Sequence, residues 1–354
     1  MVFDARASRF EALGAYLPPG IQSTPELVAS VAAHLPDLDL EGITGVAQRR
    51  VRDPRPTAGE DSLGLALKAA RDALGHSRYH AADLDVVISA SITRFVNGDD
   101  FSFEPSLAAE LAKELGAHRA AHFDVSNACA GMMTGVLLLD RMIRAGQVRN
   151  GLVVSGEQAT RVAETAAREI SDSYDPQFAS LSVGDSAVAV VLDLARDEAD
   201  RIHYLDLMTC AEYSELCLGM PSERTEGIAL YTDNRKMHKK DRLRLWPAFH
   251  GDQLAKQGRT FADEGFDYVV QHQVGTRFVD YVNRTGEAEF GTPMPESLSV
   301  VEEFGNTAST AHFLVLHRHL KAGTARRGAK YLLVPAASGV VTGALSATIT
   351  NLGV

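Results

Sequence analysis

Short continuous runs of Val, Ile, Leu and Ala recur along the chain, and between them stand segments whose apolar residues lie three and four positions apart. The first pattern predicts buried strands, and the second predicts helices with one face toward a core. Strands are predicted in the first half at residues 10–18, 84–90, 123–125, 151–155 and 187–192. Helices are predicted between them at residues 24–32, 61–74 and 104–116. This alternation predicts parallel strands covered by helices on both faces.

The second half of the chain repeats this rhythm with different residues. Strands are predicted at residues 205–210, 268–271, 331–335 and 345–349, and helices at residues 254–262, 276–281 and 307–320. The predicted fold class is therefore α/β. Because 354 residues exceed the usual size of a single core, we expect two packed domains or two halves that share one core.

Composition and charge indicate an ordinary globular enzyme. Hydrophobic residues make up 45% and charged residues 23%, and the net charge of −11 excludes an overall basic surface for nucleic acid or anionic membranes. No apolar run approaches bilayer length, so no membrane span is expected. The three cysteines form no CxxC pair and the N-terminus lacks the pattern of a secretion signal, so we expect a cytoplasmic protein without disulfides.

The segment 221–251 departs from the acidic balance of the chain. Arginine and lysine gather in it at positions 224, 235, 236, 239, 240, 242 and 244. A charge run of this kind is usually a solvated face. The alternative is a docking site for an anionic carrier or nucleotide. The sequence leaves both interpretations open.

Cys129 lies where the predicted strand at residues 123–125 turns into an apolar helix that should end at Ala145. Gly131 and Gly135 share one face of that helix and would let a neighbouring backbone come close. A thiol in the first helical turn is near unpaired N–H groups and the positive end of the helix dipole, which favour the thiolate. Cys129 is therefore a candidate nucleophile. The alternative is a small, inert core residue.

Several motifs in this order and spacing resemble the thiolase superfamily. The resemblance is to the ketosynthase III group of beta-ketoacyl-acyl carrier protein synthases and to the head-to-head acyl-condensing enzymes of the OleA type. The motifs lie at residues 14–18, 44–50, 127–131, 184–187, 272–277 and 305–308. The resemblance implies a homodimer with the thiolase fold, in which two similar halves form a five-layer α-β-α-β-α arrangement. Residues 1–197 would form the half with the cysteine, and residues 198–354 the half with a histidine and an asparagine.

The same resemblance implies a catalytic set of Cys129, His272 and Asn306. Cys129 would accept an acyl group from a thioester, and the backbone N–H groups of Cys129 and Gly339 would form the oxyanion hole. His272 and Asn306 would stabilise the enolate of a second thioester, which attacks the acyl group to give a beta-ketoacyl product. On the residues alone, His272 is equally a structural histidine and Asn306 a helix cap.

Two further site residues are implied by the resemblance. Residues 103–106 match a segment whose glutamate reaches across a dimer interface to deprotonate the second acyl chain, so Glu104 is a candidate general base. The alternative is a carboxylate favoured by the first turn of a helix. Arg277 matches a residue that contacts the phosphate of coenzyme A, which implies pantetheine thioesters as substrates and no other cofactor.

Departures from the family pattern leave two alternatives for the acyl donor. The tryptophan that stacks on adenine is missing at residues 39–42, so an acyl carrier protein is an alternative donor to coenzyme A. Gly275 stands where relatives usually have asparagine. Chain length would depend on packing among bulky residues such as Phe101, Phe103, Met132, Met133 and Phe178.

Other candidate ligands are interpreted as structural. His312, His317 and His319 suggest a metal, but no carboxylate spacing supports one, and we expect them on a helix surface without metal. Cys210 and Cys217 are expected to be packing residues.

The predicted function is Claisen condensation of acyl-Cys129 with a second acyl or malonyl thioester, in fatty-acid-like or polyketide metabolism. One alternative is an acyltransferase that delivers the acyl group to a hydroxyl or amine. An acid in place of Asn306 would suit that reaction better. A non-catalytic partner subunit is the other alternative, and the intact catalytic set argues against it.

Overall fold

The computed structural model describes residues 6–31, 33, 35–98, 100–237 and 239–354. The first residues, on which the expectation about a secretion signal depends, lie outside this part. The first half of the chain forms a five-stranded sheet in the order β1-β9-β8-β4-β7. Its strands are β1 (Ser8–Tyr16), β4 (Val86–Ser89), β7 (Ala121–Asp124), β8 (Asn150–Glu157) and β9 (Ser186–Leu194).

The first sheet is mixed rather than parallel. β4 runs parallel to β7 and β8, as predicted, but β9 is antiparallel to both of its neighbours, β1 and β8. The prediction of an all-parallel sheet is therefore wrong for β9, which runs against the other four strands. β9 is buried on both faces, and a continuous apolar run has the same pattern whichever way the strand runs.

The second half forms a six-stranded sheet in the order β10-β17-β15-β13-β14, with a short β16 paired to β17. β13 is parallel to β14 and β15, and β17 is antiparallel to β10 and β15. Its strands are β10 (Arg201–Tyr213), β13 (Tyr268–Gln271), β14 (Glu296–Ser297), β15 (Ala329–Val334), β16 (Ala336–Ala337) and β17 (Gly339–Ile349).

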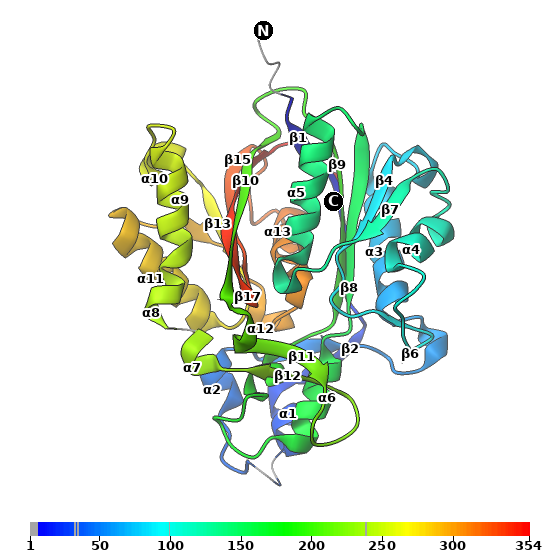
Figure 1. Cartoon of the computed structure of the whole chain (residues 1–354), viewed down its shortest axis with the longest axis vertical. Coiled ribbons are helices and arrows are strands. Elements are labelled where there is room, and N and C mark those ends of the chain that lie inside the picture. Colours follow the sequence, from blue (N-terminus) through cyan, green and yellow to red (C-terminus); the bar gives the residue numbers. More distant parts are fainter. Residues whose placement is uncertain (1–5, 32, 34, 99, 238) are drawn as a thin grey trace.

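Helices cover both sheets and fill the space between them (Figure 1). α5 (Gly131–Arg144) and α13 (Ala311–Ala322) lie between the two sheets. α3 (Ser62–His76) and α4 (Leu107–Leu115) cover the outer face of the first sheet, and α9 (Leu245–Ala255) and α11 (Thr276–Phe290) that of the second. This is the predicted α-β-α-β-α order.

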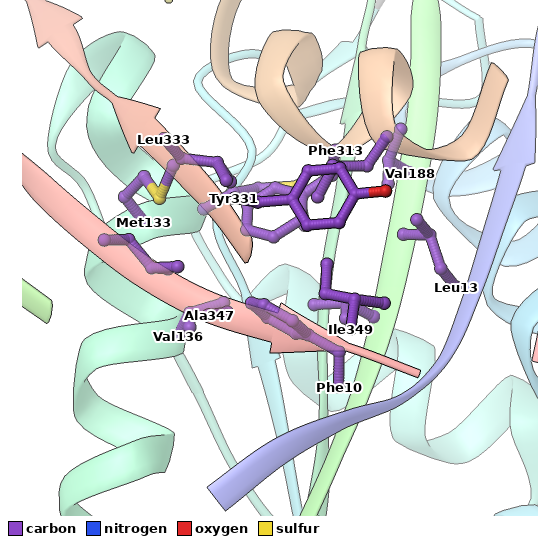
Figure 2. Packing of buried hydrophobic residues seen from close by; sticks show 14 of the residues in the cluster. Phe10, Leu13, Met133, Val136, Val188, Phe313, Tyr331, Leu333, Ala347 and Ile349 are labelled. Atoms are coloured by element: carbon purple, nitrogen blue, oxygen red, sulfur yellow. The ribbon is translucent and has the colours of Figure 1, made fainter. Parts of the chain in front are cut away.

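The central core joins both halves of the chain. Phe10 of β1 and Phe313 of α13 meet edge to face with ring centroids 5.8 Å apart, and Met133 of α5 and Tyr331 of β15 belong to the same buried cluster (Figure 2). Because both sheets contribute to it, neither half of this cluster is closed without the other.

The remaining elements frame the site or lie at the periphery. The short strands are β2 (Gly20–Ser23), β3 (Gln48–Val51), β5 (Phe95–Val96), β6 (Asp100–Phe101), β11 (Cys217–Pro221) and β12 (Ile228–Thr232). The further helices are α1 (Thr24–Val31), α2 (Leu40–Thr44), α6 (Thr160–Glu169), α7 (Asn234–Met237), α8 (Lys240–Leu243), α10 (Phe261–Glu264) and α12 (Val301–Phe304).

Two predictions about helices are wrong. The helix expected at residues 254–262 is interrupted, since Gly258 has a φ of 69° and α10 begins after its own cap at Thr260. His312 and His317, expected on a helix surface, are only 0% and 5% exposed. The physical reason is that α13 is in the middle layer, where a sheet covers each side. Only His319, near the end of α13, is partly exposed.

Among the described residues, no helix is both long and apolar enough to cross a membrane, and none of their His, Cys, Asp and Glu side chains form a group of three or more that could hold a metal ion.

Candidate active site

Cys129 lies in the 3₁₀ turn Ala128–Ala130, between β7 and α5. Ala128 adopts a φ of 44°, a left-handed conformation that is unusual for alanine and typical of constrained functional turns. Asn127 Nδ2 donates to Thr134 Oγ1 at 2.8 Å, and Thr134 Oγ1 donates to the carbonyl of Ala130 at 2.9 Å. These bonds hold the turn against the first turns of α5.

Both glycines of α5 permit a close approach to the first sheet. A Cβ atom on Gly131 would lie 2.7 Å from the carbonyl oxygen of Ala90, and one on Gly135 would lie 2.6 Å from Val153 Cγ1. The predicted role of these glycines is therefore confirmed, and the first turns of α5 lie closely over Ala90, just after β4, and over Val153 in the middle of β8.

The surroundings of the Cys129 thiol disfavour the thiolate. Burial, with smaller contributions from nearby Cys217 and Glu157, raises the pKa of Cys129 from 9.0 to about 12. The helix start is predicted to favour the thiolate, but the net shift of the pKa is upward, because removal from water outweighs the helix dipole. Cys129 is protonated at neutral pH.

His272 directly follows β13 and is held by its backbone N–H, which donates to the carbonyl of Val334 at 3.2 Å. Burial lowers the pKa of His272 to about 3, so the ring is neutral at physiological pH. Its Nδ1 is buried and has no hydrogen-bond partner among the described residues. A bare nitrogen is less costly to bury there than an N–H without an acceptor, so the proton belongs on Nε2, toward the pocket.

Asn306 lies in the loop after α12. Its backbone N–H donates to Ser182 O at 2.9 Å, and its Oδ1 accepts from the backbone N–H of Ala308 at 3.0 Å. A Cβ atom on Gly305, whose φ is 67°, would lie 2.4 Å from Ser182 O, so this approach requires glycine. The asparagine therefore caps its own loop with Oδ1 and leaves the Nδ2 hydrogens for the pocket.

A buried carboxylate that the sequence analysis did not single out supports the Asn306 loop. Glu157, at the end of β8, is 0% exposed and accepts from the backbone N–H groups of Ile92 at 2.9 Å and Thr93 at 3.1 Å. It also accepts from the hydroxyls of Ser155 and Ser309. The signal in the sequence that could have identified Glu157 is a charged residue at the end of an apolar strand.

One pocket brings the predicted catalytic residues together. Cys129, His272 and Asn306 all line the same pocket. Ala337 of β16 and Val341 of β17 pack on Cys129 and its neighbours. Gly339, with a φ of 121°, is the first residue of β17, directly after the turn from β16.

Other predicted site residues lie outside this pocket. Glu104 and Arg277 are exposed and do not belong to its lining. The bulky side chains expected to shape an acyl tunnel do not line it either. Met132, Met133 and Phe178 are buried in other clusters, and Phe101 and Phe103 are exposed.

Residues 221–251 supply a wall of the pocket that was not foreseen. Asn234, Met237, Arg242, Leu243 and Trp246 line it, while the other cationic residues of the segment are exposed. The Arg242 guanidinium lies 4.3 Å from the centre of the Tyr213 ring. Cys217 also lines the pocket, with Sγ 3.3 Å from Thr232 Oγ1, so it does more than fill the core as expected.

The end of α2, at Thr44 and Gly45, packs against the start of α11. A Cβ atom on Gly275 would lie 2.6 Å from the carbonyl oxygen of Thr44, and one on Gly45 would lie 2.0 Å from Thr276 Oγ1. This close packing gives a physical reason for the glycine at position 275, where the family usually has asparagine.

Known structures share this arrangement over almost the whole chain. A variant of OleA from Xanthomonas campestris superposes with a TM-score of 0.82 at 22% identity, covering 97% of this chain and 99% of the other. FabH from Pseudomonas aeruginosa PAO1, a 3-oxoacyl-(acyl carrier protein) synthase III, superposes with a TM-score of 0.77 at 24% identity. This match covers 98% of this chain and 99% of the FabH chain. The fold is therefore the thiolase fold of the ketosynthase III class.

Sequence comparison defines the family. The model of 3-oxoacyl-[acyl-carrier-protein] synthase III matches residues 123–210, and the model of its C-terminal part matches residues 255–349, together just over half of the chain. The beta-ketoacyl-[acyl-carrier-protein] synthase III of Laribacter hongkongensis is 28% identical over 333 residues, covering 92% of this chain and 94% of its own. That of Acidiphilium cryptum is 27% identical over 336 residues, covering 94% and 96%. The chain belongs to the 3-oxoacyl-acyl carrier protein synthase III family, as the sequence predicted.

Proposed function

We propose that the protein is a ketosynthase III-like condensing enzyme that loads an acyl group on Cys129 and joins it to a second acyl thioester. The observation that carries this proposal is the meeting of Cys129 from the first half of the chain with His272 and Asn306 from the second half in one pocket. We assign the two halves to residues 1–197 and 198–354, each with its own sheet.

In the first step the sulfur of Cys129 attacks the thioester carbonyl of the donor. The carbon–sulfur bond to the donor breaks, and the thiol proton of Cys129 ends on the released donor thiol. The negative oxygen of the intermediate is stabilised by the backbone N–H groups of Cys129 and Gly339, each worth about 3 kcal/mol. Packing of the β16–β17 turn on Cys129 supports this pairing.

In the second step His272 Nε2–H and Asn306 Nδ2–H donate to the thioester oxygen of the second substrate. Its enolate carbon attacks the acyl carbon, the bond to Cys129 breaks, and the cysteine leaves as a thiolate that takes a proton from water. Both donors are neutral at physiological pH, so they stabilise the developing charge without a resident positive charge in the pocket.

The enolate arises either by loss of carbon dioxide from a malonyl thioester or by removal of a proton from an unsubstituted one. For the second route we assign Glu104 of a second copy of the chain as the base. Glu104 is exposed and lies outside its own pocket, beside Phe101 and Phe103, which are 47% and 78% exposed. β7, the edge strand of the first sheet, exposes Ala121 and His122, so this face is suited to a homodimer.

The substrates are pantetheine thioesters, carried by coenzyme A or by an acyl carrier protein. Arg277 is exposed in the first turn of α11, where it would meet a phosphate of the pantetheine arm. An OleA structure with a TM-score of 0.80 and 22% identity was solved with bound lauric acid and lauroyl-CoA. The relatives named synthase III act with an acyl carrier protein by their names.

Acyl transfer to a hydroxyl or amine fits the pocket less well. Among the described residues that line it, none is an aspartate or a glutamate that would take the proton of such an acceptor. A non-catalytic partner subunit would not need Cys129, His272 and Asn306 together in one pocket.

The experiment is to incubate the protein with acyl-coenzyme A and to measure its intact mass. One added acyl group is expected, and it should be absent from a Cys129→Ala protein. A matched control is Cys217→Ala, because that thiol lines the same pocket. Equal loading of Cys129→Ala would overturn the proposal.

A further inference from the structure

The ring of a second buried histidine lies against His272. His312, on α13, is 0% exposed, and its ring is stacked on that of His272 with centroids 5.7 Å apart and planes inclined by 22°. His312 does not line the pocket, so it would act only through His272.

Both histidines donate a hydrogen bond to the same carbonyl oxygen. Val334 O, at the end of β15, accepts from His312 Nε2 at 3.0 Å and from the backbone N–H of His272 at 3.2 Å. A carbonyl oxygen only accepts, so His312 carries its proton on Nε2 and its Nδ1 is bare. Nδ1 of His312 is buried without a partner among the described residues.

The ring of His272 lacks the support that such rings usually have. The ring orientation of a functional histidine is commonly fixed by a hydrogen bond from its second nitrogen to a carboxylate or carbonyl. Nδ1 of His272 has no such partner among the described residues. The stacked His312 ring therefore restrains the orientation that a hydrogen bond would otherwise fix.

The surroundings also oppose protonation of His272. The titratable groups that face it are His312 from α13 and, across the pocket, the thiols of Cys129 and Cys217 and the guanidinium of Arg242. Burial and the neighbouring His312 lower the pKa of His272, and burial lowers the pKa of His312 to about 4. Two charged rings in this stack would repel in a site that is shielded from water.

We propose that His312 is a positioning residue that holds the ring of His272 as a neutral Nε2–H donor directed into the pocket. This inference rests on the proposed function for its catalytic consequence. His312 should matter for the condensation step, where His272 binds the developing oxyanion, and not for the loading of Cys129.

Two variants separate the parts of this role. His312→Phe keeps a stacked ring but loses the bond to Val334, and His312→Val loses both. His317→Phe is the matched control, since His317 is also buried on α13 but lies near Asp72, with Nε2 3.9 Å from a carboxylate oxygen, away from the pocket. We expect loading of Cys129 to stay within about twofold in all three, while kcat for condensation falls on the order of 10–100-fold in His312→Val and less in His312→Phe. KM should stay unchanged.

A second measurement is independent of activity. In protein labelled with ¹⁵N-histidine, with the His272 signal assigned by its loss in His272→Asn, His272 should show the Nε2–H tautomer and should not titrate above pH 5. In His312→Val, His272 should show mixed tautomers and a titration midpoint at higher pH, whereas in His317→Phe it should match the parent protein.

The outcomes are distinct. An Nδ1–H tautomer of His272 in the parent protein, or an unchanged His272 signal in folded His312→Val, overturns the inference. A loss of condensation that is equal in His317→Phe, or that extends to loading, overturns it as well. If the parent protein neither loads Cys129 nor condenses, the proposed function fails, but the tautomer of His272 still decides the inference.

Discussion

Ser309 Oγ donates a hydrogen bond of 2.6 Å to Glu157 Oε1 and so joins the loop of Asn306 to the first sheet. Ser309 is three residues after Asn306, and Glu157 ends β8. Because Glu157 also accepts from the backbone N–H groups of Ile92 and Thr93, one carboxylate joins the end of β8, residues 92–93 and the loop of Asn306.

Replacement of this carboxylate should weaken both fold and site. In Glu157→Gln an amide N–H₂ faces donors that had an acceptor, so we expect a loss of about 2 kcal/mol in the free energy of unfolding and slower condensation. The exposed Glu212→Gln is the control and should change neither. Chemical denaturation measures the stability. An unchanged midpoint and slope for Glu157→Gln would contradict the role given to the carboxylate.

The glycines of α5 should not tolerate a methyl group. In Gly131→Ala the new Cβ would lie 2.7 Å from the backbone oxygen of Ala90, so α5 must shift, and we expect a loss of about 1–3 kcal/mol with slower loading of Cys129. Gly75→Ala in α3 is the matched control, because no atom lies within 4 Å of its Cβ position, and alanine should stabilise it by about 0.5–1 kcal/mol. Equal effects of the two substitutions on Tm and on loading would refute this explanation.

The thiol of Cys129 should react as a high-pKa group in the empty enzyme. Because its pKa is raised from 9.0 to about 12, alkylation by iodoacetamide should rise about tenfold per pH unit and should not level off below pH 10. Peptide mapping distinguishes Cys129 from Cys210 and Cys217. A plateau below pH 8 would show instead a thiolate stabilised by the helix start.

The raised pKa of Cys129 also makes the free energy of unfolding depend on pH in the alkaline range. Between pH 9 and 12 the unfolded thiol loses its proton while the folded one keeps it, so the folded state binds more protons and stability falls as pH rises. Relative to Cys129→Ala, the parent protein should lose up to about 1.4 kcal/mol per pH unit in this window. The difference between the two proteins in urea unfolding measures this, and a pH-independent difference would argue against a buried, protonated thiol.

Glu104 should matter for one kind of second substrate. We expect the Glu104→Ala protein to lose the condensation of two unsubstituted acyl thioesters. It should keep the condensation with a malonyl thioester, because decarboxylation needs no base at the alpha carbon. Glu110→Ala, in the first turn of α4, is the control. Mixing Glu104→Ala with Cys129→Ala subunits should restore part of the activity if the base acts across a dimer. No restoration in proven mixed dimers would place Glu104 outside the partner's site.

The sequence was informative where chemistry depends on local order. The turn at Cys129, the glycines of α5 and the positions of His272 and Asn306 at the ends of elements all followed from residues that are close in the chain. The direction of β9 did not, because a strand buried on both faces has no directional pattern.

Properties that depend on the environment of a side chain were missed. His312 was placed on a surface because histidine is a polar residue type, but it lies between two sheets. Glu157 gains its donors from distant segments. The dipole argument for Cys129 was sound in direction, but it omitted the burial that dominates the pKa. The pocket wall at Arg242 and Trp246 likewise depends on the packing of a segment with no clear apolar period.

A single-turnover chase tests the central claim most directly. Protein loaded with one acyl group is mixed with a malonyl or unsubstituted acyl thioester, and the mass of the Cys129 peptide and the released product are followed together. The account predicts that acyl-Cys129 disappears as a beta-ketoacyl thioester forms, and that His272→Ala and Asn306→Ala proteins load normally but discharge on the order of 10²–10³ times more slowly. Discharge to free acid, ester or amide without a beta-ketoacyl product, or equal discharge by all three proteins, would contradict it.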